Sequence, residues 1–97
     1  MPTYISLVQY TNKGIEAIKD SPKRLDAAKK AFEDAGAKLK DFYLVMGAYD
    51  IVIIVDAPND EVVAKVNLML GAKGSIRTQT FRAFGEAEYR KIVASLS

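Results

Sequence analysis

The chain is short, nearly neutral, and free of both cysteine and histidine. Its 97 residues include 14 basic and 12 acidic side chains, which gives a formal net charge of +2. Without cysteine and histidine, the chain has no disulfides, no thiolate metal site and no imidazole to act as a general base near neutral pH. We therefore expect a single domain over residues 1–97 that holds no metal and no cofactor.

Charge and hydropathy patterns also set expectations about partners. The basic residues are spread along the chain, so no polybasic tract indicates direct nucleic-acid binding. No stretch approaches the roughly 20 apolar residues of a membrane span, and the N-terminus lacks the order of a signal peptide. We expect a cytoplasmic protein that binds neither nucleic acid nor membranes.

The first half of the chain predicts a strand and then a broken helix. Residues 3–10 are rich in β-branched and aromatic types, which favour a strand. An apolar stripe at helical spacing follows, but Ser21-Pro22 interrupts it. We therefore predict a short helix at about 12–19 and a longer one at about 22–35. The stripe consists of Ile15, Ile18, Leu25, Ala28 and Phe32.

The second half predicts three more strands and two more helices. Strands at about 38–46 and 49–56 flank a tight turn at Gly47-Ala48, and the last strand covers about 75–84. A helix opens at the acidic pair Asp60-Glu61, between the third and fourth strands. A final helix follows Gly85. Its apolar positions at i, i+3, i+4 and i+7 are Tyr89, Ile92, Val93 and Leu96.

This order of elements, β-α-β-β-α-β plus a C-terminal helix, predicts an α+β fold. Right-handed crossovers give the ferredoxin-like antiparallel sheet with strand order 4-1-3-2 and both long helices on one face. Residues 41–46 and 49–55 are apolar on both sides, which is typical of strands covered on both faces. We therefore predict that two copies pack sheet to sheet as a dimeric α+β barrel. The final helix either caps its own sheet or crosses to the partner.

Topology gathers a group of polar residues and glycines at one rim of the predicted sheet. The end of the first strand, the turn, and the starts of the third and fourth strands meet there. Glycine lets backbone N–H groups approach a ligand, and an acid, a base and two phenols could hold a polar molecule. In the competing structural interpretation, Gly47 only serves the turn and Asp50 pairs with Arg77. The rim residues are Tyr10, Gly47, Tyr49, Asp50, Gly71, Gly74 and Arg77, and Thr80 joins them as a ligand-binding candidate.

Catalytic candidates are fewer, and no catalytic residue is predicted. Ser6 and Tyr4 share one side of the first strand, but no histidine is present to activate a serine. Thr78, Thr80 and Arg82 share one face of the fourth strand. They either line a polar cavity or discourage stray pairing along an edge strand.

Two resemblances accompany these patterns. The segment Gly47-Ala48-Tyr49-Asp50, followed by an apolar strand, resembles the Gly-Tyr-Asp signature of the GYD-domain family, with Ala48 inserted. The chain is also similar to the effector-binding domain of leucine-responsive regulatory proteins, which has a Gly-x-Tyr-Asp hairpin and an Arg-Thr-x-Thr strand. This second resemblance implies dimers formed through the sheets, with small molecules such as amino acids bound between subunits. The matching residues are Gly47, Tyr49, Asp50, Arg77, Thr78 and Thr80.

Three functional hypotheses follow. The leading one is a homo-oligomeric module, without catalysis, that holds a small polar metabolite at the rim of the sheet or between subunits. The alternative is a cofactor-independent enzyme of the dimeric α+β barrel type, monooxygenase- or isomerase-like. A deep apolar cavity beneath Tyr4, Ser6 and Arg82 would favour it. The third is a structural or partner-binding protein that uses an outward helix face.

Overall fold

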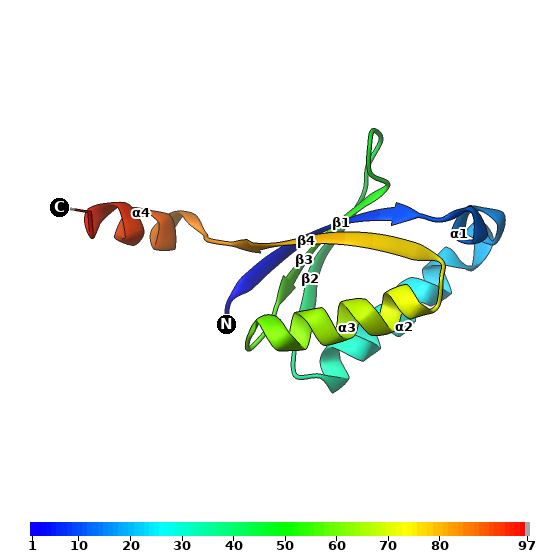
Figure 1. Cartoon of the computed structure of the whole chain (residues 1–97), viewed down its shortest axis with the longest axis horizontal. Helices are drawn as coiled ribbons and strands as arrows, with labels where there is room; N and C mark the ends of the chain where they lie inside the picture. The colour runs from blue at the N-terminus through cyan, green and yellow to red at the C-terminus, as the bar shows by residue number, and fades with distance from the viewer. Residues whose placement is uncertain (97) are drawn as a thin grey trace.

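The structure, a computed structural model, describes residues 1–96 and contains the predicted elements in the predicted order (Figure 1). The four strands form one antiparallel sheet with order β2-β3-β1-β4, which confirms the ferredoxin-like topology. Within residues 1–96, none of the helices has the length and apolar composition of a membrane-spanning segment. The elements are β1 (Thr3–Tyr10), α1 (Asn12–Glu16), η1 (Ile18–Asp20), α2 (Ser21–Asp34), β2 (Lys38–Leu44), β3 (Ile51–Asp56), α3 (Asp60–Ala72), β4 (Ile76–Ala83) and α4 (Glu86–Ala94).

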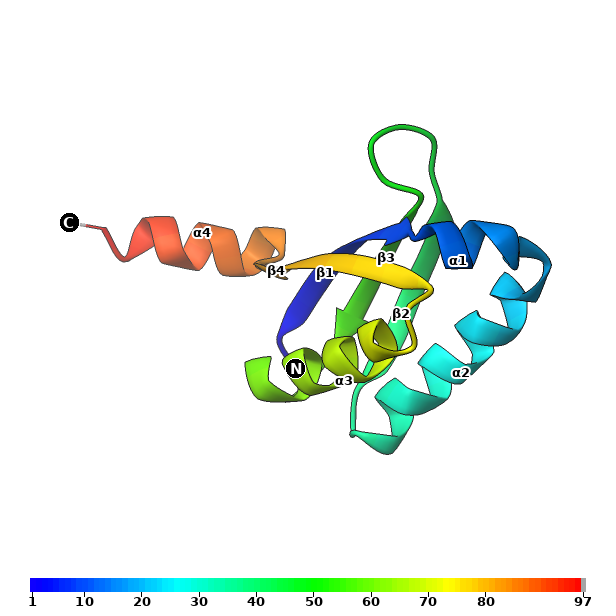
Figure 2. The same cartoon turned by 45° about the vertical axis from the view of Figure 1, so that its right-hand side comes forward.

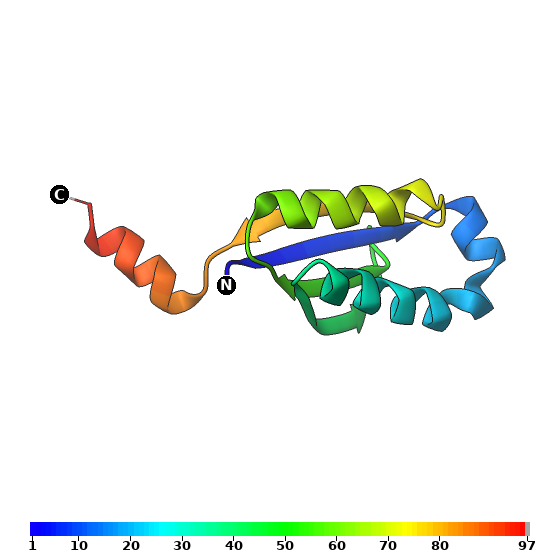
Figure 3. The same cartoon turned by 90° about the horizontal axis from the view of Figure 1, so that it is seen from below.

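The core lies between the sheet and the two long helices. Figure 3 shows α2 and α3 side by side across the same face of the sheet. Alternate residues of β1 and β3 point toward these helices and are buried. Phe32 of α2 is fully buried among them. The other buried apolar residues of this core include Tyr4, Val8, Ile51, Ile53, Val55, Val63, Val66 and Leu70.

The opposite face of the sheet is also apolar, and the described helices leave it uncovered (Figures 1 and 3). Ile5 lies between Ile54 and Phe81 across the strands, and Leu7 lies beside Val52. Phe81 is 46% exposed, and the other four are partly buried by neighbours within the sheet. We call this surface the open face: Ile5, Leu7, Val52, Ile54 and Phe81.

The predicted break in the first helix is confirmed, but its apolar stripe is only partly buried. The backbone of Gly14 packs so closely on the segment before β4 that an added Cβ would lie 2.1 Å from the Ser75 carbonyl oxygen. α1 docks through this glycine, and Ile15 and Ile18 of the predicted stripe are 53% and 43% exposed.

The predicted tight turn at Gly47-Ala48 is also wrong. β2 ends at Leu44 and β3 begins at Ile51, so six residues form a projecting loop, seen clearly in Figure 2. The Val45 N–H donates to the Asp50 carbonyl at 2.8 Å and closes the base of the loop. The Asp50 N–H bonds instead to the carbonyl of Val8 at 2.9 Å. This contact holds the end of the loop against β1.

Truncation of Phe32 should test the core most directly. Phe32→Ala removes a fully buried ring and is expected to lower the free energy of unfolding by about 3–5 kcal/mol. Leu68→Ala is the matched control because Leu68 is 75% exposed, and its effect should stay within about 0.5 kcal/mol. Urea unfolding followed by circular dichroism measures both. Equal effects would contradict the assigned core.

Candidate functional site

The structure separates the predicted rim residues onto two sides of the sheet. Tyr10 points toward the helices, where its hydroxyl lies 2.9 Å from the Ser21 hydroxyl. Tyr49 and Arg77 lie on the side of the open face. Thr80 points toward α3 instead, where Asn67 donates to it. The predicted set therefore does not form one site.

Asp50 serves the backbone at the rim. Its carboxylate accepts a hydrogen bond from the Tyr10 N–H at 2.9 Å, at the end of β1. Within residues 1–96 it makes no ion pair with Arg77, so the pairing considered from the sequence is absent there. Gly47 has a φ of 147°, a conformation that favours glycine, and the space around it is open. Both residues shape the loop.

Tyr49 and Arg77 border a hollow at the edge of the open face, which we call the rim hollow. Its volume is about 220 Å³. The Tyr49 hydroxyl donates to the Gln79 side-chain oxygen, and the Gln9 side-chain amide donates to the Ala48 carbonyl at 2.8 Å. Arg77 is exposed and, within residues 1–96, supplies the one charge in the lining and forms no side-chain hydrogen bond or ion pair. The lining is Leu7, Gln9, Tyr49, Arg77, Thr78 and Gln79.

A second hollow of about 260 Å³ lies under α3, on the helix side of the sheet. The Ser6 and Thr80 hydroxyls are 2.6 Å apart, and the Asn67 amide donates to Thr80 at 2.9 Å. These contacts satisfy a polar patch inside an otherwise apolar layer. The lining is Tyr4, Asp60, Val63, Ala64, Asn67, Thr80 and Arg82. Apolar surface makes up most of this lining, but Asp60, Asn67 and Arg82 share it. The Ser6 hydroxyl is already bonded to Thr80, so the hollow is not the purely apolar cavity that would favour the enzyme hypothesis.

Tyr4 connects this second hollow to the start of α3. Its hydroxyl donates to the Asp60 carboxylate. This hydrogen bond, burial of the ring and the negative charge of Asp60 raise the pKa of Tyr4, while the charge of Arg82 opposes them. The guanidinium of Arg82 lies 5.9 Å from the centre of the Tyr4 ring. The strand register pairs Tyr4 with Arg82, and the folded chain brings Asp60 to Tyr4.

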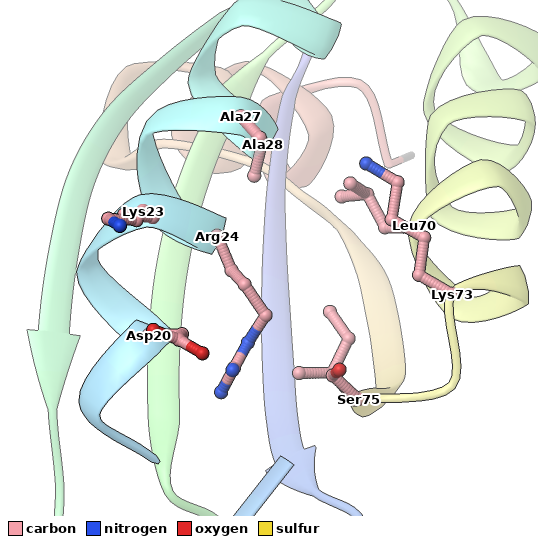
Figure 4. A pocket seen from close by; sticks show the side chains of 9 residues that line it. Asp20, Lys23, Arg24, Ala27, Ala28, Leu70, Lys73 and Ser75 are labelled. Carbon is pink, nitrogen blue, oxygen red and sulfur yellow. The ribbon is translucent and has the colours of Figure 1, made fainter. Parts of the chain in front are cut away.

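A third cleft, between α2 and α3, is shown in Figure 4. Ala28 and Leu70 form its walls, and Lys23 and Lys73 lie at its edges. The guanidinium of Arg24 donates to the carbonyls of Ala17 at 2.8 Å and Gly14 at 3.2 Å. Arg24 therefore satisfies the carbonyls that end α1, a structural role that spacing along the sequence did not indicate.

Comparison with known proteins assigns the family. The model of the GYD domain matches residues 4–93. The chain belongs to the GYD domain family. A relative from Thermus thermophilus, named glutamine synthetase and cystathionine beta-lyase binding protein, is 35% identical over 89 residues. That match covers 91% of this chain and 94% of the relative.

Solved structures show the same fold at low sequence identity. The feast or famine regulatory protein from M. tuberculosis, solved with L-methionine, superimposes with a TM-score of 0.66 at 13% identity. TTHA0845 from Thermus thermophilus superimposes with a TM-score of 0.56 at 23% identity, and the match covers 88% of this chain and 95% of TTHA0845. The match to the regulatory protein covers 88% of this GYD-domain chain, which spans about half (51%) of that longer protein.

Ionisation of Tyr4 should destabilise the fold at alkaline pH. Because the folded pKa is raised above the usual 10.0, the folded phenol stays neutral where the unfolded one ionises. The stabilisation is complete below about pH 10 and is lost as the pH rises toward the raised value. Urea unfolding at about pH 8 and about pH 11 measures the change in the free energy of unfolding. Between these two pH values, the free energy of unfolding should fall more for the wild type than for Tyr4→Phe. Equal losses would contradict the Tyr4–Asp60 contact.

Proposed function

We propose that this chain is a single-domain, homo-oligomeric module that binds a small carboxylate-bearing molecule in the rim hollow. The observation that supports it is the position of that hollow: the Arg77 guanidinium, which has no ion-pair partner among residues 1–96, lies among neutral polar groups beside the uncovered apolar face. A second copy supplies the cover and encloses the ligand between subunits.

The chemistry of the rim hollow favours an anionic group. Arg77 offers a planar set of donors that matches a carboxylate, and among residues 1–96 the lining holds no acidic side chain to oppose it. The amides of Gln9 and Gln79 and the Tyr49 hydroxyl can bond to the remaining polar atoms of the ligand. The rim hollow has a volume of about 220 Å³, whereas most ligand pockets have volumes of about 300–1,000 Å³. The partner's surface therefore completes the site.

The name of the Thermus relative supports a second candidate function, the binding of a metabolic enzyme. That relative matches this chain across nearly its whole length. The outward face of α3 offers a contact surface, because Leu68 and Met69 are 75% and 50% exposed. In this candidate, the module regulates an enzyme such as glutamine synthetase through α3.

Ligand binding is tested by thermal unfolding with a panel of L-amino acids and dicarboxylates. At least one is expected to raise the melting temperature of the wild type. Arg77→Ala removes charged hydrogen bonds worth about 1.5–3 kcal/mol, so the Kd should rise about 10- to 150-fold. Tyr49→Phe should weaken binding less.

Lys65→Ala on α3 is the control, because Lys65 is exposed and lies outside the hollow. The Lys65→Ala variant should show the same ligand-induced rise in melting temperature as the wild type. If the Arg77→Ala variant keeps the full ligand-induced rise in melting temperature, the ligand binds outside the rim hollow.

The enzyme-binding candidate is tested with purified glutamine synthetase on a biosensor surface. Leu68→Asp should lower the response at least tenfold, since it places a charge in an apolar contact, whereas Lys65→Asp should have a smaller effect. No response from the wild type would rule out glutamine synthetase as the partner and leave the rim hollow unaffected.

A further inference from the structure

α4 is an amphipathic helix whose apolar side has no partner among the described residues. It projects from the end of β4, away from the sheet (Figures 1 and 2). Apolar residues on it and just beyond its end recur at i, i+3, i+4 and i+7, the spacing of a helix that packs on a surface. They are 46–73% exposed. We call them the α4 stripe: Tyr89, Ile92, Val93 and Leu96.

Contacts at the junction hold α4 in this direction. The guanidinium of Arg82 lies 4.3 Å from the centre of the Phe84 ring and 3.5 Å from the Glu88 carboxylate. The other oxygen of Glu88 accepts the Gly85 N–H at 3.5 Å. These contacts span the short link between β4 and α4. They are made with α4 directed away from its own sheet.

The chain exposes more surface than a compact monomer of its size. Its accessible surface is 6687 Å², whereas a monomer of this mass exposes about 5,500 Å². Its radius of gyration is 14.7 Å, against about 12.5 Å for a compact chain of this length. The chain therefore exposes about 1,200 Å² more surface than such a monomer, which is more than the roughly 800 Å² that each partner buries in a standard interface.

We propose that α4 is an exchanged arm, which crosses to a second copy and packs the α4 stripe on that copy's open face. This inference rests on the homo-oligomer of the proposed function and adds which element crosses. Both surfaces are apolar and belong to the same chain, so one two-fold exchange covers two stripes and two open faces. A different partner protein would leave one of the two exposed.

Paramagnetic broadening between chains tests the exchange. The native chain has no cysteine, so Lys91→Cys, on the polar side of α4, carries a single spin label. Labelled chains at natural isotope abundance are refolded together with ¹⁵N-labelled wild-type chains. Broadening of the ¹⁵N amides of Ile5, Leu7 and Val52 is expected, since it can arise only between chains. A label at Lys29→Cys on the outer side of α2 should leave them sharp.

Two matched variants keep the proposal falsifiable. Ile92→Asp places a charge in the α4 stripe and should abolish the broadening, whereas Ala94→Asp, on the other side of α4, should retain it. Sharp amides of Ile5, Leu7 and Val52 in the mixed sample, or broadening confined to the amides of α4, would overturn the arm exchange. Light scattering measures the mass of the mixed sample and shows which proposal has failed. A dimer without broadening at the open face would overturn only the exchange of α4. A monomer would overturn the proposed homo-oligomer as well.

Discussion

The structure depends on one constraint: a four-stranded sheet with both long helices on one side still has a second apolar side. Alternation along β1 makes this unavoidable, because Tyr4 and Val8 enter the core while Ile5 and Leu7 point the other way. Exposed apolar surface costs about 25 cal/mol per Å², so the open face strongly favours association. The core around Phe32 stabilises the fold of the single chain, and the proposed oligomer would bury the open face.

Assembly and ligand binding share a surface in this account. The rim hollow lies at the edge of the open face, and Leu7 belongs to both. A molecule bound by Arg77 would therefore be held at the boundary between subunits. Binding there is thermodynamically linked to association, so a ligand that bridges two copies stabilises the oligomer by its own binding free energy. Such linkage would let a metabolite change the form in which the module meets an enzyme.

The sequence predicted the elements, the strand order and the apolar open face, because each follows from local periodicity and from right-handed connections. The sequence did not predict that the rim residues would lie on two different sides of the sheet. The loop before β3 differs from a tight turn because Asp50 bonds to Val8 and Tyr10, which are tertiary contacts invisible to local patterns. Thr80 shares its side of the sheet with Ser6 through the strand register. The direction of α4 depends on Arg82, Phe84 and Glu88 meeting in space.

The most direct test of the central claim is sedimentation equilibrium of the untagged full chain across low micromolar concentrations. The open face predicts a well-folded species of at least twice the 10.7 kDa subunit mass at every concentration. A cooperative, fully folded particle at the subunit mass would show that a single copy tolerates its uncovered sheet, and would contradict the account.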